Sequence, residues 1–175
     1  MGKIAPVKPV KLIIGFIFKE KIFFEQAKRL LTGYFGKTDF ESGIIPFTST
    51  SYYEEELGSG LWRVFVSFAK LIKPQQIARI KILTNRIEEK LSNGKKRSVN
   101  IDPGYLNSAK LVLASTKDYV HRIYLDKGIY AEITLFYQDK SFQDWKWTYP
   151  DFRSKEHIGI FNRIRELYAE QTKDK

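Results

Sequence analysis

The sequence contains no cysteine, and this absence excludes several kinds of chemistry. The chain has no disulfide, no thiol nucleophile and no zinc site built on thiolates. Histidine is scarce as well, since His121 and His157 are the only two and lie 36 residues apart, which is not the spacing of a histidine metal site. We therefore expect no zinc, and any metal would be a hard divalent cation such as Mg²⁺, bound by Asp and Glu.

Long apolar runs and the common nucleotide motifs are also missing. The apolar run at residues 12–18 is too short to cross a bilayer, and charged residues follow it at once. The sequence has no G-x-x-x-x-G-K-[ST] phosphate loop, no G-x-G-x-x-G fingerprint and no G-x-S-x-G nucleophile elbow. We expect a cytoplasmic protein with no membrane partner, with residues 1–9 as an extended tail and residues 10–175 as a single domain.

Positive charge is what the chain has in excess. Its 30 basic and 20 acidic residues give a formal net charge of +10. The excess is concentrated in residues 1–30, which carry +5, and in residues 70–97, which carry +7 and end in the run 95–97 of Lys, Lys and Arg. These segments suit an anionic partner such as nucleic acid or a phosphorylated metabolite, and a solubilising lysine-rich surface explains them equally well.

The order of the predicted elements is β-α-β-β-α-β. The pattern predicts a buried strand at 10–18, a helix at 22–35, a broken strand at 38–48, a strand at 62–68, a helix from Pro74 to Leu91 and a strand at 98–102 stopped by Pro103. This is the element order of the ferredoxin-like fold. We therefore expect an α+β protein with a ferredoxin-like core.

A β-hairpin and a helix are expected after this core. The hairpin consists of residues 120–125 and 129–137, joined by a three-residue loop in which Gly128 is left-handed. Ser154 is the predicted N-cap of the last helix, whose apolar stripe is His157, Phe161, Ile164 and Tyr168. Residues 106–116 suit a helix or a strand, and residues 145–148 suit a short strand.

The two faces of the hairpin differ in chemistry. Pairing Leu125 with Ile129 places Tyr124 opposite Tyr130, and Arg122 opposite Glu132. One face is then aliphatic and predicted to be core: Ile123, Leu125, Ile129, Ala131, Ile133 and Leu135. The other face is polar, either as a solvated surface with one ion pair or as the floor of a site where Arg122 binds an anion.

A second group of polar residues lies at the end of the 98–102 strand. Asn100 and Asp102 share a face there, and a carboxylate at a strand end suits catalysis, although Asp before Pro-Gly also suits a turn. Asp151 suits a ligand site or the start of the last helix. The predicted catalytic residues are Asp102 and Glu132, and the predicted ligand-binding residues are Asn100, Tyr105, Lys110, Arg122, Tyr130 and Asp151.

Three classes of function remain open at this level. The first is an enzyme or a ligand-binding domain for a small anionic, phosphorylated molecule. The second is an RNA-binding module that uses the basic segments, with Phe65 as the one outward-facing aromatic of a partial RNA-recognition signature at 65–68. The third is an interaction module without chemistry.

Several short segments together point to a known family. They are Lys8–Leu12, Tyr52–Glu54, Asn100–Tyr105, Lys110–Asp118, His121–Leu125, Gly128–Glu132 and Thr148–Asp151. With these segments the chain resembles the prokaryotic domain-of-unknown-function family 4416 along almost its whole length. The resemblance implies a stand-alone domain of this size and transfers no catalytic role.

Overall fold

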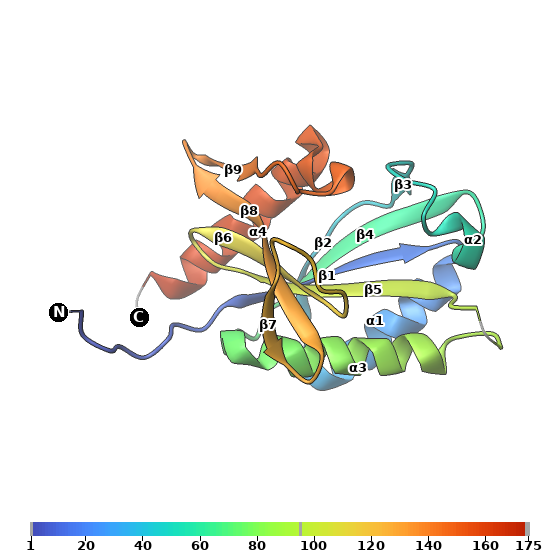
Figure 1. The fold of residues 1–175 in the computed structure, drawn as a ribbon, viewed down its shortest axis with the longest axis horizontal. Coiled ribbons are helices and arrows are strands. Elements are labelled where there is room, and N and C mark those ends of the chain that lie inside the picture. The colour runs from blue at the N-terminus through green and yellow to red at the C-terminus, as the bar shows by residue number, and fades with distance from the viewer. Residues whose placement is uncertain (1, 95, 174–175) are drawn as a thin grey trace.

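One antiparallel sheet organises the chain. The computed structural model describes residues 2–94 and 96–173, which form a nine-stranded sheet and four α-helices, confirming an α+β fold (Figure 1). The strands lie in the order β2-β4-β1-β5-β6-β8-β7, with β3 also paired to β4 and β9 to β8. Their bounds are β1 Lys11–Phe18, β2 Thr38–Glu41, β3 Ile45–Phe47, β4 Leu61–Phe68, β5 Val99–Leu106, β6 Lys110–Ser115, β7 Ile123–Asp126, β8 Ile129–Gln138 and β9 Ser141–Asp144.

Two helices cover one face of the sheet. These are α1 (Lys21–Phe35), which ends at Phe35 as predicted and has Gly36 as its C-cap, and α3 (Ile77–Lys90), which follows a 3₁₀ turn, η1 (Pro74–Gln76). Figure 1 shows both on the same side of β1 and β5. Every residue of β1 is buried, because β1 lies between β4 and β5 and has apolar layers on both faces. Its residues Leu12, Ile14, Phe16 and Phe18 belong to the core beneath α1 and α3.

The last helix covers the other face. Helix α4 (Lys155–Thr172) follows a second 3₁₀ turn, η2 (Pro150–Arg153), and the Ser154 side chain accepts a hydrogen bond from the His157 N–H at 3.1 Å. This confirms the predicted N-cap, and all four residues of the predicted stripe are buried. Phe161 packs against Phe65 of β4, so this part of the sheet has helices on both sides.

The sheet divides where β6 leaves β5. The two strands pair only over Gly104–Leu106, where a Cβ on Gly104 would lie 2.5 Å from the Val112 carbonyl oxygen. The prediction that the strand stops at Pro103 is wrong, because β5 continues to Leu106. The N–H and C=O of Ile101 point away from β1. Pro103 lies two residues later, so its nitrogen points to the same side, where no described strand pairs with it. The edge of β5 before Gly104 is thereby left free.

The β7–β8 hairpin differs from the prediction only next to its turn. Asp126 pairs with Ile129, so the loop contains only Lys127 (φ 52°) and Gly128 (φ 76°), and Leu125 is the extra residue of a bulge. Positive φ at both central residues is the requirement of a type I′ turn. The left-handed Gly128 is therefore confirmed, as is the pairing of Tyr124 with Tyr130, whereas the three-residue loop is wrong.

The aliphatic face of this hairpin is not a continuous core. Ile123 and Leu125 are 71% and 40% exposed, whereas Glu132 and Thr134 from the supposedly outer face are buried. The polar face is buried because neighbouring segments cover it: Arg122 bonds to Glu132, to the Lys117 carbonyl and to Tyr149, and Thr148 donates to the Thr134 carbonyl. A bulge at Thr134 in the β6–β8 pair also interrupts the alternation along β8. Ile129 and Leu135 are buried as predicted.

Smaller differences concern the loops. Residues 110–115 form a strand, and the strand expected at 145–148 lies instead at 141–144, as β9. The short helix α2 (Glu54–Leu57) ends before Gly58, and its N-cap carries no side-chain hydrogen bond. Among the described residues, no helix has the length and apolarity needed to cross a membrane.

Candidate functional site

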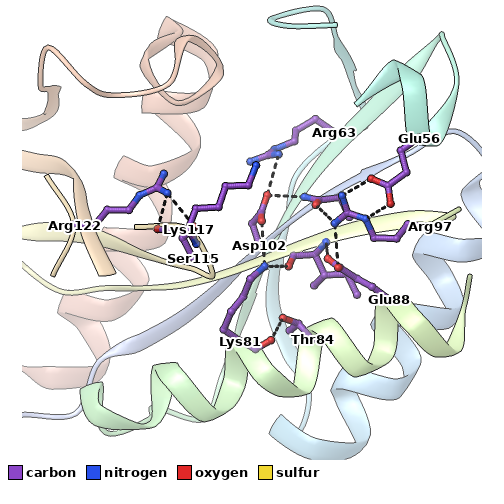
Figure 2. A network of polar contacts seen from close by, with 12 residues as sticks. Glu56, Arg63, Lys81, Thr84, Glu88, Arg97, Asp102, Ser115, Lys117 and Arg122 are labelled. Atoms are coloured by element: carbon purple, nitrogen blue, oxygen red, sulfur yellow. Dashed lines mark hydrogen bonds and ion pairs between the residues drawn. The ribbon is translucent and has the colours of Figure 1, made fainter. Parts of the chain in front are cut away.

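A cavity of about 830 Å³ opens beside the free edge of β5. Its walls come from the segment before α2, from α3, from the end of β6, from β8 and from residues 149–152. Because β6 turns away from β5 at Gly104, side chains rather than a neighbouring strand line this part of the sheet. Charged residues of both signs line it, among them Arg63, Lys81 and Asp102 (Figure 2).

Arg63 forms the floor of the cavity. It starts on β4 and crosses over Gly15 of β1 to reach Asp102 on β5. The crossing requires glycine, since a Cβ at position 15 would lie 2.9 Å from Arg63 Nη2. The guanidinium carbon lies 4.6 Å from the ring centre of Phe65 and 5.0 Å from that of Phe152, and the side chain is only 1% exposed.

The guanidinium of Arg63 has carboxylates nearby but no direct hydrogen bond. Nη1 lies 3.9 Å from Asp102 Oδ2, and Nη2 lies 3.4 Å from Asp151 Oδ2. Within residues 2–94 and 96–173, Nε and Nη2 are buried without a hydrogen-bond partner. A buried unsatisfied donor costs about 1–3 kcal/mol. Arg63 is thus a buried cation beside the cavity, and two of its nitrogens have no hydrogen-bond partner in the described chain.

Two side chains of α3 satisfy the free edge of β5. The Ile101 N–H donates to Glu88 Oε1 at 2.5 Å, and Lys81 Nζ donates to the Ile101 carbonyl at 3.0 Å. Lys81 also lies 3.5 Å from Asp102 Oδ1. Burial raises the pKa of Glu88. These bonds replace the missing strand and fix Asp102 at the cavity wall (Figure 2).

Arg97 joins α2 to this wall. Its Nε and Nη2 donate to the two oxygens of Glu56 at 2.7 and 2.6 Å, and its Nη1 donates to Asn100 at 2.8 Å and to Glu88 at 3.1 Å. The hydrogen bonds from Arg97 lower the pKa of Glu56. Asn100 in turn donates to Asp102 Oδ2 at 2.7 Å. Arg97 is therefore a structural cation rather than a free phosphate contact, and Lys95 of the same basic run lies outside the described residues.

A second cluster surrounds Glu132. Its Oε2 accepts a hydrogen bond from Arg122 Nε at 2.8 Å and lies 3.1 Å from His121 Nε2. Arg122 also donates to Ser115 Oγ, to the Lys117 carbonyl and to the Tyr149 hydroxyl at 3.2, 2.9 and 3.1 Å. Four of the five N–H donors of Arg122 are thus used by the protein.

Five of the eight predicted site residues line the cavity, namely Asn100, Asp102, Arg122, Glu132 and Asp151. Asp102 and Glu132 belong to separate clusters with their own partners. Tyr105, Lys110 and Tyr130 do not line it: Tyr105 packs against the core beneath α3, and Tyr130 packs against Tyr124. Asp151 does not cap α4, since Ser154 does, and its carboxylate lies beside Arg63 instead.

The sequence predictions missed the central residue, Arg63. Its signal was the single charged residue in a strand, Leu61–Phe68, that is otherwise apolar except for Ser67. Lys81 and Glu88 were missed as well, although a spacing of seven residues places both on one face of a helix. Tyr53 is the third omission: burial and the nearby Asp102 raise the pKa of its phenol, so its hydroxyl remains a hydrogen-bond donor at the cavity.

The structure bears on two further expectations. Phe65, the expected stacking aromatic of an RNA surface, is 1% exposed and lies beneath Phe152 and Phe161, so the interpretation of Phe65 as outward-facing is wrong. In the part of the chain that the structure describes, no three His, Asp or Glu side chains are grouped so as to hold a metal ion by themselves.

The fold and the cavity define an α+β protein built on a large antiparallel sheet. The chain belongs to the family described as domain of unknown function DUF4416, whose family model matches residues 8–168. No curated protein and no solved structure matches the chain. The matched range includes all the short segments on which the resemblance rests, and every strand that lines the cavity.

Proposed function

We propose that this protein binds a small anionic, phosphorylated molecule in the cavity, as an enzyme or as a ligand-binding domain, with Arg63 as the main anion contact. The observation that carries the proposal is the buried guanidinium whose donors have no hydrogen-bond partner in the described chain. Arginine in this state suits a phosphate or carboxylate, because its planar donors match two oxygens at once.

The surroundings of Arg63 support a ligand of moderate size. The cavity volume of about 830 Å³ lies within the usual range of small-molecule sites. The protonated hydroxyl of Tyr53 supplies a donor on the same wall. At the mouth of the cavity, Lys117 Nζ donates to the Tyr52 hydroxyl at 2.5 Å and lies 4.5 Å from the centre of the Tyr52 ring. Lys117 is therefore a second cation at the opening.

Arg63 replaces Arg122 as the anion contact in this proposal. Arg122 has bonds to four protein groups and would have to break them to bind a ligand. Arg63 has no hydrogen bond to any described residue, although Asp102 and Asp151 lie beside it. Asp102 and Glu132 remain the candidates for proton transfer, with Asp102 nearer the anion because it faces Arg63.

A thermal-shift screen tests the proposal. The probes are inorganic phosphate, pyrophosphate, glucose 6-phosphate and AMP, each with Mg²⁺ present. A probe at 100 times its Kd stabilises the protein by about 2.7 kcal/mol, which raises the Tm by several degrees. We expect Arg63→Gln to abolish the rise and Arg29→Gln, an exposed control on α1, to preserve it. If no probe raises the Tm, or if Arg63→Gln responds like the wild type, the proposal is wrong.

We also infer that the N-terminal part of the sheet is a ferredoxin-like core within a single domain of residues 10–175. Two features support this: the order β2-β4-β1-β5 of antiparallel strands, and the two crossovers made by α1 and α3. The strands β6–β9 and α4 are then additions that extend the sheet and cover its second face. A fragment that ends after β5 tests whether residues 10–175 form a single domain. Without α4 its Phe65 would be exposed, so we expect this fragment not to fold.

A further inference from the structure

The two carboxylates beside Arg63 are held very differently. Asp102 accepts a hydrogen bond from Asn100 at 2.7 Å and lies 3.5 Å from Lys81 Nζ. Asp151 is 7% exposed, and no described group hydrogen-bonds its carboxylate; its one ion pair is the 3.4 Å contact with Arg63. Asp151 lines the cavity, and its oxygens are not among the side-chain atoms buried without a partner, so a ligand in the cavity can reach them. Asp151 is therefore the free ligand group of this wall.

The backbone of Asp151 is firmly placed although its carboxylate is free. Asp151 lies in η2, directly before α4, and His157 Nδ1 contacts its carbonyl oxygen. Its neighbour Phe152 is buried against Phe65 and Phe161. The carboxylate thus projects toward Arg63 from a rigid support, as a preorganised binding group does.

Charge balance in this cluster shows what an anion would need. Arg63 and Lys81 face Asp102 and Asp151, which gives two positive and two negative groups. Arg97 adds no spare positive charge, because it is shared by two carboxylates, Glu56 and Glu88. With Arg97 included, the cluster has three basic and four acidic groups, so a phosphate dianion would bring two further negative charges that nothing in the cluster compensates, which is costly at low dielectric. One divalent cation offsets those two charges.

We propose that the phosphorylated ligand binds together with a divalent hard cation, Mg²⁺ or Mn²⁺, that bridges its phosphate oxygens to the carboxylate of Asp151. This inference rests on the proposed function. Mg²⁺ is commonly held by one or two carboxylates together with substrate phosphates and water, rather than by a cage of protein groups. The absence of any three-carboxylate group among the described residues agrees with that mode.

The test measures the binding of pyrophosphate and AMP with Mg²⁺ and with EDTA in its place. Coupling between two ligands is commonly 5–150-fold, so we expect Mg²⁺ to tighten the probe by about tenfold or more. Asp151→Asn should remove that gain, and Asp118→Asn, an exposed control, should keep it. If a probe binds equally well in EDTA, the cation is wrong while the proposed function stands. If no probe binds under either condition, both are wrong.

A spectroscopic measurement on the wild type does not depend on the variants folding. Mn²⁺ bound at Asp151 beside a phosphate would strongly broaden the ³¹P resonance of protein-bound AMP at substoichiometric metal. We expect this broadening in the wild type and in Asp118→Asn and its loss in Asp151→Asn. Undiminished broadening in a folded Asp151→Asn protein would overturn the assignment to Asp151.

Discussion

Arg122 and Arg63 line the same cavity, and the protein treats them in opposite ways. Arg122 lies 2.8 Å from Glu132 and bonds to three further groups, so its charge holds the 115–122 segment to Tyr149. Arg63 is as deeply buried, yet its nearest carboxylate oxygen lies 3.4 Å away and two of its nitrogens have no partner in the described chain. A satisfied buried arginine stabilises a fold, whereas an unsatisfied one at a cavity indicates a binding site.

Replacement of each arginine by methionine separates these roles. Arg122→Met leaves Glu132 buried without its main partner and should destabilise the protein by about 3–5 kcal/mol. Arg63→Met removes two unsatisfied donors but also the one ion pair of Asp151, so it should cost less than Arg122→Met, about 1–3 kcal/mol. Urea denaturation at neutral pH measures both. A larger loss for Arg63→Met would reverse the comparison and make Arg63 the structural residue.

The second prediction concerns the glycine under Arg63. In Gly15→Val the Cβ would lie 2.9 Å from Arg63 Nη2 and 3.1 Å from the Phe65 ring, so the guanidinium must move. Overpacking of this kind costs about 1–3 kcal/mol, and the probe-induced rise in Tm should disappear with it. Gly43→Ala is the control, because a Cβ there meets nothing within 4 Å. Wild-type stability and probe binding in Gly15→Val would show that Arg63 does not depend on this crossing.

The third prediction concerns the hairpin that positions Glu132. Gly128 has a φ of 76°, which a β-branched residue resists, so Gly128→Val should destabilise the fold by about 1 kcal/mol or more. Thermal denaturation measures the loss, with Gly43→Val as the matched control outside the turn. An unchanged Tm would contradict the turn and the β7–β8 register.

The fourth prediction is a dependence on pH. Burial lowers the pKa of His157 below its ordinary value of 6.5, so the unfolded chain takes up a proton that the folded chain resists. The contribution of His157 is therefore complete above pH 6.5 and decreases as the pH falls below it, with a slope of at most about 1.4 kcal/mol per pH unit. Urea denaturation between pH 6.5 and 5.5 should show a shallower slope for His157→Gln than for the control His121→Gln. Equal slopes would contradict it.

Local patterns were the part of this fold that the sequence could predict. The stripe and N-cap of α4, the end of α1 at Gly36 and the left-handed Gly128 each depend on residues within one or two turns of chain. The bulges at Leu125 and Thr134 depend on pairing between strands, and the burial of the polar hairpin face depends on the 115–122 segment that covers it, so alternation within the hairpin could predict neither. The end of β5 was mispredicted for the same reason. Pro103 is tolerated within this strand because no described strand pairs with its nitrogen side.

The site followed the same division. Parity within one strand correctly placed Asn100 and Asp102 on one wall. The role of Arg63 could not be predicted from the sequence. It depends on the register of β4, β1 and β5 together and on a glycine at the crossing. Asp151 acquires its place beside Arg63 only when α4 folds over the sheet.

The most direct measurement observes the two arginine side chains themselves. In ¹⁵N-labelled protein the Nε–H resonances of Arg63 and Arg122 can be assigned from Arg63→Lys and Arg122→Lys, and then followed during titration with pyrophosphate and AMP in Mg²⁺. The account predicts a saturable shift of the Arg63 resonance, with the Arg122 resonance nearly unchanged because Glu132 already holds that nitrogen at 2.8 Å. A shift confined to Arg122, or none at Arg63, would contradict the claim that Arg63 binds the anion.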